Sequence, residues 1–581
     1  MILQALTKLY EDLADKGKTS RLGWSEGKVS YALRIDDNGK LIDIMLLTSE
    51  EERNGKKLLL PKKMVIPAPV KRSSGISPNF LCDNSSYILG IGDTNKKNRT
   101  IQCFLACRNL HNEVLKDVNS CAAKALLSFF NNWDPEKEEE SLVLAHYKED
   151  IIKDANITFW YGDSFIFEDS LIMDAWNKQY QKSNDEDTEM VCLVTGEKGK
   201  VEAIHPSIKG IRGAQTAGAA LVSFNADAFE SYSKKQNYNA PVSSYATFAY
   251  TTALNYLIAD RDNVNYIGDT AVLLWAEGAE VGFRSLANMC LFGAKDNYST
   301  KDIMEKMKRI ASGKKIEFDE TMIDPDRKFY VLGIAPNAAR LSIRFFWCNT
   351  FGKFIKNIEE HYKRLEIVKP ENEQYEDLPI WKILKETVRE NPNSKNTMAS
   401  PNMSGQLLQS ILSDYRYPAT LLNSINIRIR ADRKINRCRA AIIKAYYLKN
   451  KNVEIPEEVL KVALNTETKN IPYNLGRLFA VLENIQQKAN PGINTTIRDK
   501  YLNSASSTPA VVFPILLNLS QKHLNKIPVG LQVALSKEMQ DIMDKFDEEF
   551  PKRLNLAQQG SFQLGYYHQT QARYQSKSKE D

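Results

Sequence analysis

The sequence predicts an α+β region of about 400 residues followed by an all-helical C-terminal bundle. In the first 400 residues, short strand-like runs bounded by Gly, Pro and Asn alternate with helical stretches. Between residues 371 and 402 the chain becomes polar and rich in Pro and Asn, and longer segments with helical periodicity follow. We therefore expect an N-terminal α+β part at 1–130, a central α+β part at 131–400 and a helical bundle at 401–581.

The first elements have clear local signals. Apolar residues recur at three- and four-residue spacing from Ile2 to Leu13, which predicts an amphipathic helix that ends near Gly17. The pattern then changes to two strands, at 29–35 and 41–47. They are joined by Asp-Asp-Asn-Gly at 36–39, a strong hairpin signal.

The remaining elements follow from length and periodicity. Further strands are predicted at 57–66, 80–91 and 191–194. In the C-terminal part, helices are predicted at 459–464, 475–487, 510–524 and 531–546. Residues 426–449 are mostly helix formers, so one long helix with cations along one side is also expected there.

Composition excludes several classes of protein. The chain has 581 residues, of which 43% are apolar and 26% charged, as in an ordinary globular protein. The most apolar windows fall short of the roughly 20 residues that span a bilayer, so we expect no membrane partner. Eight scattered cysteines predict a reducing, cytoplasmic compartment. The net charge of +6 is too small to indicate a nucleic-acid partner unless the cations are clustered.

The sequence offers no positive evidence for an active site. The six histidines stand apart, and no Gly-x-Ser-x-Gly motif occurs. We therefore expect no metal, no cofactor and no enzymatic activity. The alternative is a metal-dependent nuclease whose site is assembled from scattered carboxylates such as Asp260, Asp262 and Asp269.

Two cationic segments lie in the N-terminal part. The first, at 71–84, combines cations, hydroxyls and amides that suit contacts to phosphates and base edges: Lys71, Arg72, Ser73, Ser74, Asn79, Phe80 and Asn84. An aromatic ring such as that of Phe80 also suits stacking on an unpaired base. The second segment, at 95–99, contributes Lys96, Lys97 and Arg99. The alternatives are a solvated basic turn and, for Phe80, core packing.

Two more cationic segments follow. At 209–218 three glycines allow close approach of the backbone to a ligand, and Lys209, Arg212 and Gln215 supply side chains, although tight backbone packing would explain the glycines equally well. From 416 to 449 the chain has nine cations against one acid, Asp432. This excess favours an anionic partner over a solvated helix face. Its central members are Arg428, Arg430, Arg433, Lys434, Arg437 and Arg439.

Over nearly its whole length the chain resembles the large subunit of the subtype I-C CRISPR Cascade surveillance complex. The resemblance rests on stretches such as Met1-Ile-Leu-Gln-Ala-Leu, Ser74-Gly-Ile-Ser-Pro-Asn-Phe-Leu-Cys-Asp-Asn84, Cys192-Leu-Val-Thr-Gly-Glu197, Lys209-Gly-Ile-Arg-Gly-Ala-Gln215, Leu332-Gly-Ile-Ala-Pro-Asn337, Arg428-Ile-Arg-Ala-Asp-Arg-Lys434 and Leu564-Gly-Tyr-Tyr-His-Gln569. It implies a non-catalytic subunit that recognises the protospacer-adjacent motif in double-stranded DNA, promotes duplex opening and R-loop formation, and helps recruit a helicase–nuclease. The implied partners are guide RNA, other Cascade subunits, target DNA and its displaced strand.

The family's arrangement places motif sensing in the N-terminal domain. We therefore assign the segment at 71–84 to the motif and its phosphates, and Lys96, Lys97 and Arg99 to flanking phosphates. The cations at 209–215 and 428–439 are assigned to the DNA backbone or the displaced strand on charge alone. A third reading is a purely structural ribonucleoprotein subunit whose cations face acidic groups of neighbouring proteins.

Overall fold

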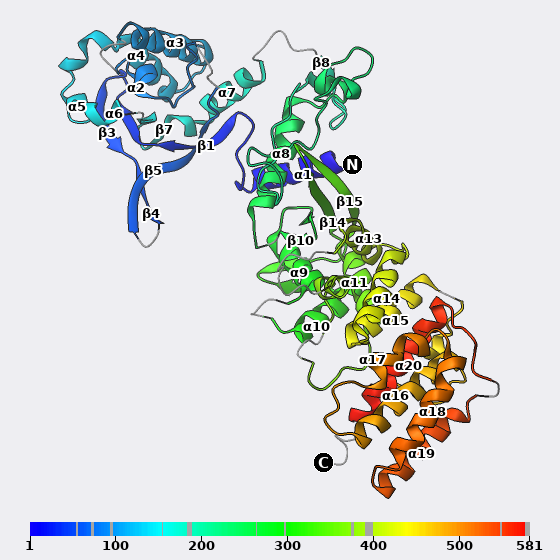
Figure 1. The fold of residues 1–581 in the computed structure, drawn as a ribbon. Helices are drawn as coiled ribbons and strands as arrows, with labels where there is room; N and C mark the ends of the chain where they lie inside the picture. The colour runs from blue at the N-terminus through cyan, green and yellow to red at the C-terminus, as the bar shows by residue number, and fades with distance from the viewer. Residues whose placement is uncertain are drawn as a thin grey trace. The chain divides into compact units, whose positions relative to one another are not determined.

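The chain divides into two compact units. The structure is a computed structural model, and it describes residues 1–53, 56–70, 75–92, 97–153, 155–182, 189–262, 264–294, 298–373, 377–389, 399–451, 453–546 and 549–575 (Figure 1). The first unit holds Leu3–Pro206 and Phe224–Ala253, and the second holds Ser207–Ser223 and Leu254–Asp581. The boundary expected near residue 400 therefore falls inside the second unit.

Two sheets and a set of helices build the first unit. One sheet has the strand order β3-β2-β6-β7, and the other has the order β1-β5-β4. The strands are β1 (Trp24–Val29), β2 (Tyr31–Ile35), β3 (Leu41–Leu46), β4 (Thr48–Arg53), β5 (Lys56–Pro67), β6 (Ile157–Tyr161) and β7 (Ser164–Phe165). The helices are α1 (Ile2–Asp15), α2 (Ser85–Ile88), α3 (Lys97–Leu115), α4 (Cys121–Asn132), α5 (Leu142–Ala145), α6 (Lys148–Ile151) and α7 (Ser170–Lys182).

A small hairpin completes the first unit, and one helix extends beyond it. The hairpin is formed by β8 (Glu189–Val191) and β9 (Lys198–Lys200), which pair in antiparallel register. Helix α8 (Ser244–Ala259) begins in the first unit, and the division between the units falls within it.

The predicted opening helix and first hairpin are confirmed. Helix α1 buries the predicted apolar face, and Gly17 follows it with a φ of +65°, as expected for a glycine after a helix end. Strands β2 and β3 pair in antiparallel register. The Asp36 carboxylate accepts the backbone N–H groups of Asn38 at 3.0 Å and Lys40 at 2.8 Å, which fixes the turn between them.

The strand predicted at 80–91 is wrong. Leu81 has a φ of +59°, which a strand does not accommodate, and its N–H donates to Nε2 of His111 at 3.0 Å. The side chain of Asn84 then accepts the N–H of Ser86 and caps the short helix α2. A run of apolar residues does not distinguish a strand from a buried loop, because both place apolar side chains in a core.

The second unit begins with a four-stranded sheet of order β10-β11-β14-β15. Its strands are β10 (Asn265–Ile267), β11 (Thr270–Ala276), β14 (Lys328–Asn337) and β15 (Arg340–Thr350), and a separate hairpin is formed by β12 (Ile316–Phe318) and β13 (Thr321–Ile323). The helices α9 (Val281–Phe292), α10 (Thr300–Ala311) and α11 (Phe351–Leu365) belong to the same part.

The helical C-terminal region is confirmed. It consists of α12 (Ile380–Lys385), α13 (Pro401–Leu412), α14 (Ala419–Asp432), α15 (Arg437–Asn450), α16 (Ile471–Ala489), α17 (Ile497–Ala505), α18 (Pro509–Leu524), α19 (Val529–Met543) and α20 (Leu556–Gln575) (Figure 1). One hydrophobic core runs from Ile267 to Tyr567, so the sheet and the helices share an interior. Within the described part of the chain, no helix is long and apolar enough to cross a membrane.

The closest packing in the helical region joins α16 to α20. A Cβ atom added to Gly476 would lie 2.0 Å from the carbonyl oxygen of Phe562, and one added to Gly565 would lie 2.0 Å from that of Tyr473. Each glycine therefore allows one helix backbone to lie directly against the other.

The prediction of a single helix at 426–449 is wrong, because the helix is interrupted by a turn between α14 and α15. Arg433 has a left-handed backbone with a φ of +51° and ends α14. The Asn436 side chain then accepts the N–H of Arg439 at 2.9 Å and caps α15. The cations of this segment are thus divided between two helices and a turn.

Candidate nucleic-acid interface

The N-terminal loop at 75–84 is held by main-chain contacts. The Oδ1 atom of Asn79 accepts the N–H of Val70 at 2.9 Å, and the N–H of Asn79 donates to the Asp83 carboxylate at 2.8 Å. Asp83 also exchanges backbone hydrogen bonds with Ile157 at the start of β6. The side-chain oxygen predicted to read a base at Asn79 is therefore used to close the loop.

Phe80 does not reach the surface, so its assignment to base stacking is corrected. Its exposed fraction is 0%, and its ring is stacked between Trp176 at 4.7 Å and His111 at 5.0 Å, measured between ring centroids. A base would reach this ring only if the hydrophobic core opened. The core alternative for Phe80 is the one that the structure supports.

The cations beside this loop are better placed for phosphate contacts. Arg99 is exposed in the first turn of α3, where its Nη2 atom donates to the carbonyl oxygen of Gly75 at 3.3 Å, and Lys97, two residues earlier, is also exposed. The side-chain oxygen of Asn84 caps α2, so this residue, like Asn79, has a hydrogen bond within the protein. The predicted site residues Lys71, Arg72, Ser73, Ser74 and Lys96 lie outside the described residues.

The β1–β5 pair adds exposed cations that the sequence analysis missed. Lys28 lies directly opposite Lys63 in the antiparallel register, and Lys62 precedes Lys63 on β5. All three side chains are exposed. The strand at 57–66 was predicted, but its partner and register depend on contacts between residues far apart in the chain, so the facing lysines could not be inferred.

The glycine-containing loop at 209–218 presents its predicted side chains to solvent. Lys209, Arg212 and Gln215 are exposed, whereas Ile211 is buried beneath them. The N–H groups of Lys209 and Arg212 donate to the side chains of Asn255 at 3.0 Å and Tyr266 at 3.1 Å, which hold the loop in place. The backbone is thus tightly anchored, as the packing alternative expects, and because the three polar side chains are exposed their assignment to binding stays a prediction.

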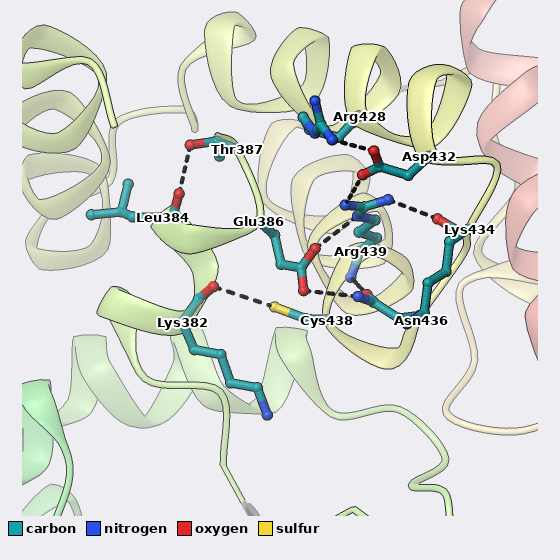
Figure 2. A network of polar contacts seen from close by, with 10 residues as sticks. All are labelled: Lys382, Leu384, Glu386, Thr387, Arg428, Asp432, Lys434, Asn436, Cys438 and Arg439. Carbon is teal, nitrogen blue, oxygen red and sulfur yellow. Dashed lines mark hydrogen bonds and ion pairs between the residues drawn. The ribbon is translucent and has the colours of Figure 1, made fainter. Parts of the chain in front are cut away.

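The predicted cations at 428–439 do not form one exposed helix face: Arg430, Arg433 and Lys434 are exposed, Arg428 is half-buried, and Arg437 and Arg439 are buried. Figure 2 shows that Arg439 lies at the centre of a polar network. Its guanidinium donates to the carboxylates of Glu386 at 2.7 Å and Asp432 at 2.6 Å, and to the carbonyl oxygen of Lys434 at 2.9 Å. Arg428 pairs with the same Asp432.

Burial and ion pairing oppose each other at Asp432. Burial raises the pKa of its carboxyl group, but hydrogen bonds from Arg439 and Arg428 outweigh it, so the net pKa is below the ordinary value. The carboxylate therefore stays charged and neutralises part of the cation excess. A charge count over residues 416–449 includes Asp432 but not Glu386, because Glu386 lies 53 residues before Arg439.

Other cations of this segment also face inward. Arg437 is 8% exposed and Lys444 is 3% exposed. The ammonium group of Lys444 donates to the carbonyl oxygens of Arg364 at 3.0 Å and Glu366 at 2.7 Å, at the end of α11, and burial lowers its pKa to about 8. These residues stabilise the helical region and are not part of its surface.

A smaller cationic surface remains where α14 ends beside α17. We call it the α17 surface and define it as the exposed side chains of Arg430, Arg433, Lys434 and Lys500. Arg433 donates to the carbonyl oxygen of Asp499, and Asn503 donates to that of Arg430 at 3.1 Å. Lys500 lies over the ring of Tyr501 at 5.1 Å. Lys500 was missed because its own sequence neighbourhood has no cation excess.

The carboxylates considered for a nuclease site do not converge. Asp260 pairs with Arg284, whereas Asp269 pairs with Arg344 at 3.0 Å. Among the residues that the structure describes, no group of three or more His, Cys, Asp or Glu side chains is placed to hold a metal ion.

The two units thus present exposed cations on anchored loops, which defines a candidate nucleic-acid-binding protein. A family model described as CRISPR-associated protein (Cas_Csd1) matches residues 6–574. The chain belongs to this CRISPR-associated family, since the match covers nearly its whole length. No curated protein matches it.

Proposed function

We propose that the chain is the non-catalytic large subunit of a subtype I-C Cascade complex. In this role it recognises the protospacer-adjacent motif in double-stranded DNA, promotes duplex opening and R-loop formation, and helps recruit the helicase–nuclease. The carrying observation is the group of exposed cations at the N-terminal loop, in a chain that belongs to a CRISPR-associated family. RNA-guided complexes need such a protein surface, because base pairing reads the guide match and protein reads only the short motif and the backbone.

Within the first unit we assign phosphate contacts and motif contacts to two different groups of residues. Lys97 and Arg99, together with Lys28 and Lys63 of the β1–β5 pair, are assigned to phosphates, because all four are exposed cations. Lys71, Arg72 and the two serines that follow remain the candidates for motif contacts. Asn79 and Asn84 are assigned to supporting roles, because their side-chain oxygens accept the backbone N–H groups of Val70 and Ser86.

The second unit is assigned to DNA backbone or displaced-strand contacts. Its contributions are the loop with Lys209, Arg212 and Gln215 and the α17 surface. Exposed Lys and Arg side chains on anchored backbone suit a sequence-independent contact, which releases counterions from the nucleic acid. Arg428, Arg437 and Arg439 are removed from this assignment.

The deciding experiment measures which flanking bases the assembled complex selects. Complexes with and without this chain are incubated with duplexes that carry a guide match and randomised flanks, and the bound fraction is sequenced. We expect selection of a short motif only with the chain, and its loss in the Lys71→Ala/Arg72→Ala variant. Motif selection that persists without the chain would overturn the proposal.

A matched pair on one helix tests the phosphate contacts. Arg99→Ala should weaken binding to all flanking sequences alike, whereas Lys116→Ala, about 25 Å away at the other end of α3, should have no effect. Equal effects of the two substitutions would remove Arg99 from the interface.

Incubation of the chain with DNA and Mg²⁺ or Mn²⁺ tests the non-catalytic assignment, for which we expect no cleavage.

A further inference from the structure

The first unit contains a groove that is unsuited to nucleic acid. Two cavities, of about 600 Å³ and 260 Å³, share Leu22, Tyr180 and Tyr245 in their linings and are therefore adjacent. The larger cavity is bordered by the β8–β9 hairpin and the start of α8, and the smaller by α1. Segments from distant parts of the chain thus line both cavities, which together we call the groove.

Carboxylates outnumber cations along this groove. The larger cavity is lined by Glu189, Glu197 and Glu202 against Lys198 and Lys200. The smaller is lined by Glu11 and Asp15 against Arg21. In a chain of net charge +6, this excess of negative charge would repel a phosphate backbone and attract a cation.

Aromatic side chains form the shared wall. Tyr180 is 40% exposed and Tyr245 is 36% exposed, so each ring has a solvent-facing part. Burial raises the pKa of Tyr245 to about 12, helped by the negative charges of Glu11 and Asp15. Burial and Glu202 likewise raise the pKa of Tyr180. Both hydroxyl groups therefore stay protonated at neutral pH and can act as hydrogen-bond donors.

Hydrogen bonds between distant segments hold the groove in shape. The hydroxyl of Tyr245 donates to Glu11 at 3.3 Å, and Trp24 donates to Asn177 on α7 at 2.9 Å. A preformed site avoids the entropic cost of ordering loops when a ligand binds. Half-exposed tyrosines beside carboxylates suit guanidinium and ammonium groups, through cation–π contacts and charge-assisted hydrogen bonds.

We propose that this groove docks an Arg- and Lys-bearing segment of a partner protein. Its negative charge and its aromatic wall together match such a segment, and the negative charge does not match the phosphate backbone of DNA or RNA. The inference goes beyond the proposed function and does not depend on motif recognition, because binding to the groove is measured on the full chain in the absence of DNA.

Charge reversal of the groove provides the test. A fluorescein-labelled peptide of alternating Arg, Lys and Gly is titrated against the full chain, and its anisotropy is followed at two salt concentrations. We expect Asp15→Lys/Glu197→Lys to weaken binding about tenfold at low salt, and less at high salt because surface charges are then screened. Both side chains are exposed and line the groove, so the fold should persist.

The matched control is Glu113→Lys/Asp117→Lys, which makes the same charge change at exposed positions at the end of α3. This variant should bind the peptide like the unmodified chain. Carbodiimide cross-linking, which joins carboxylates to peptide amines, should identify Glu189 or Glu197 by mass spectrometry. Equal weakening in both variants, cross-links only outside the groove, or preferential binding of an acidic peptide or single-stranded DNA would each overturn the proposal.

Discussion

Two cations of the helical region show how burial decides a residue's role. Arg439 has a side chain that is 7% exposed and binds two carboxylates, whereas Lys500 is exposed on α17. A charge count along the chain treats both as available to an anionic ligand. The structure assigns the first to stability and leaves only the second for binding.

Arg439→Gln should destabilise the protein. Removing the guanidinium leaves Glu386 and Asp432 without their shared partner, and breaking a buried ion pair in this way costs up to ~3–5 kcal/mol. Because both carboxylates are partly exposed, we expect a loss of about 2–3 kcal/mol in the free energy of unfolding, measured by urea denaturation. The control is Arg430→Gln, an exposed position, where a loss of similar size would contradict this account.

Lys500→Gln should have the reverse profile. Its affinity for a DNA duplex should fall for all sequences, and the dependence of log affinity on log salt should lose about one unit, as for one phosphate contact. Its stability should change by less than ~0.5 kcal/mol. Lys522→Gln, on the exposed side of α18 and about 20 Å along that helix from its start, is the control. An unchanged salt slope for Lys500→Gln would exclude the α17 surface from DNA binding.

At the scale of elements, the sequence predicted those helices and turns that are fixed by contacts between residues close together in the chain. The first hairpin was predictable because Asp36 bonds to residues two and four positions later. The strand expected at 80–91 failed because Leu81 and Asp83 are fixed by His111 and Ile157, which are 30 and 74 residues away. Sequence periodicity contains no information about such partners.

The junction of α16 and α20 yields a steric prediction. In Gly476→Ala the new methyl group would meet the carbonyl oxygen of Phe562, so the helices must separate, and overpacking of this kind costs ~1–3 kcal/mol. We expect a corresponding drop in the urea midpoint. Gly530→Ala is the control, because nothing lies within 4 Å of its added Cβ and alanine favours the helix. Equal effects at both positions would show that close packing is not the reason for Gly476.

For the whole molecule, the sequence predicted the class and the broad division of secondary structure. The α+β region, the helical region and the CRISPR-associated family are all confirmed. It did not predict the groove of the first unit, because its carboxylates come from α1 and from the β8–β9 hairpin, almost two hundred residues apart along the chain. A small net charge of +6 conceals surfaces of opposite charge, because their charges largely cancel in the sum.

Both units should lose stability in mild acid. The first unit buries His111 and His205 and the second buries His361 and His568, and burial lowers the pKa of each imidazole, to about 4 in the first pair and about 3 in the second. Each folded-state pKa is below the value of roughly 6.5 in the unfolded chain. The stability from the neutral imidazoles is therefore complete above pH 6.5 and is lost as the pH falls toward the folded-state values.

The expected slope is ~1.4 kcal/mol per pH unit for each histidine once the pH is well below 6.5. Urea denaturation at pH 7.5, 6.5 and 5.5 measures it. In His568→Asn, which removes the partner of the Tyr473 hydroxyl at 2.9 Å, stability at pH 7.5 should fall but its dependence on pH should become shallower. His146→Asn, at an exposed position, should change neither. A stability that is constant from pH 7.5 to 5.5 would mean that the imidazoles accept protons without unfolding, and that their burial does not hold them neutral.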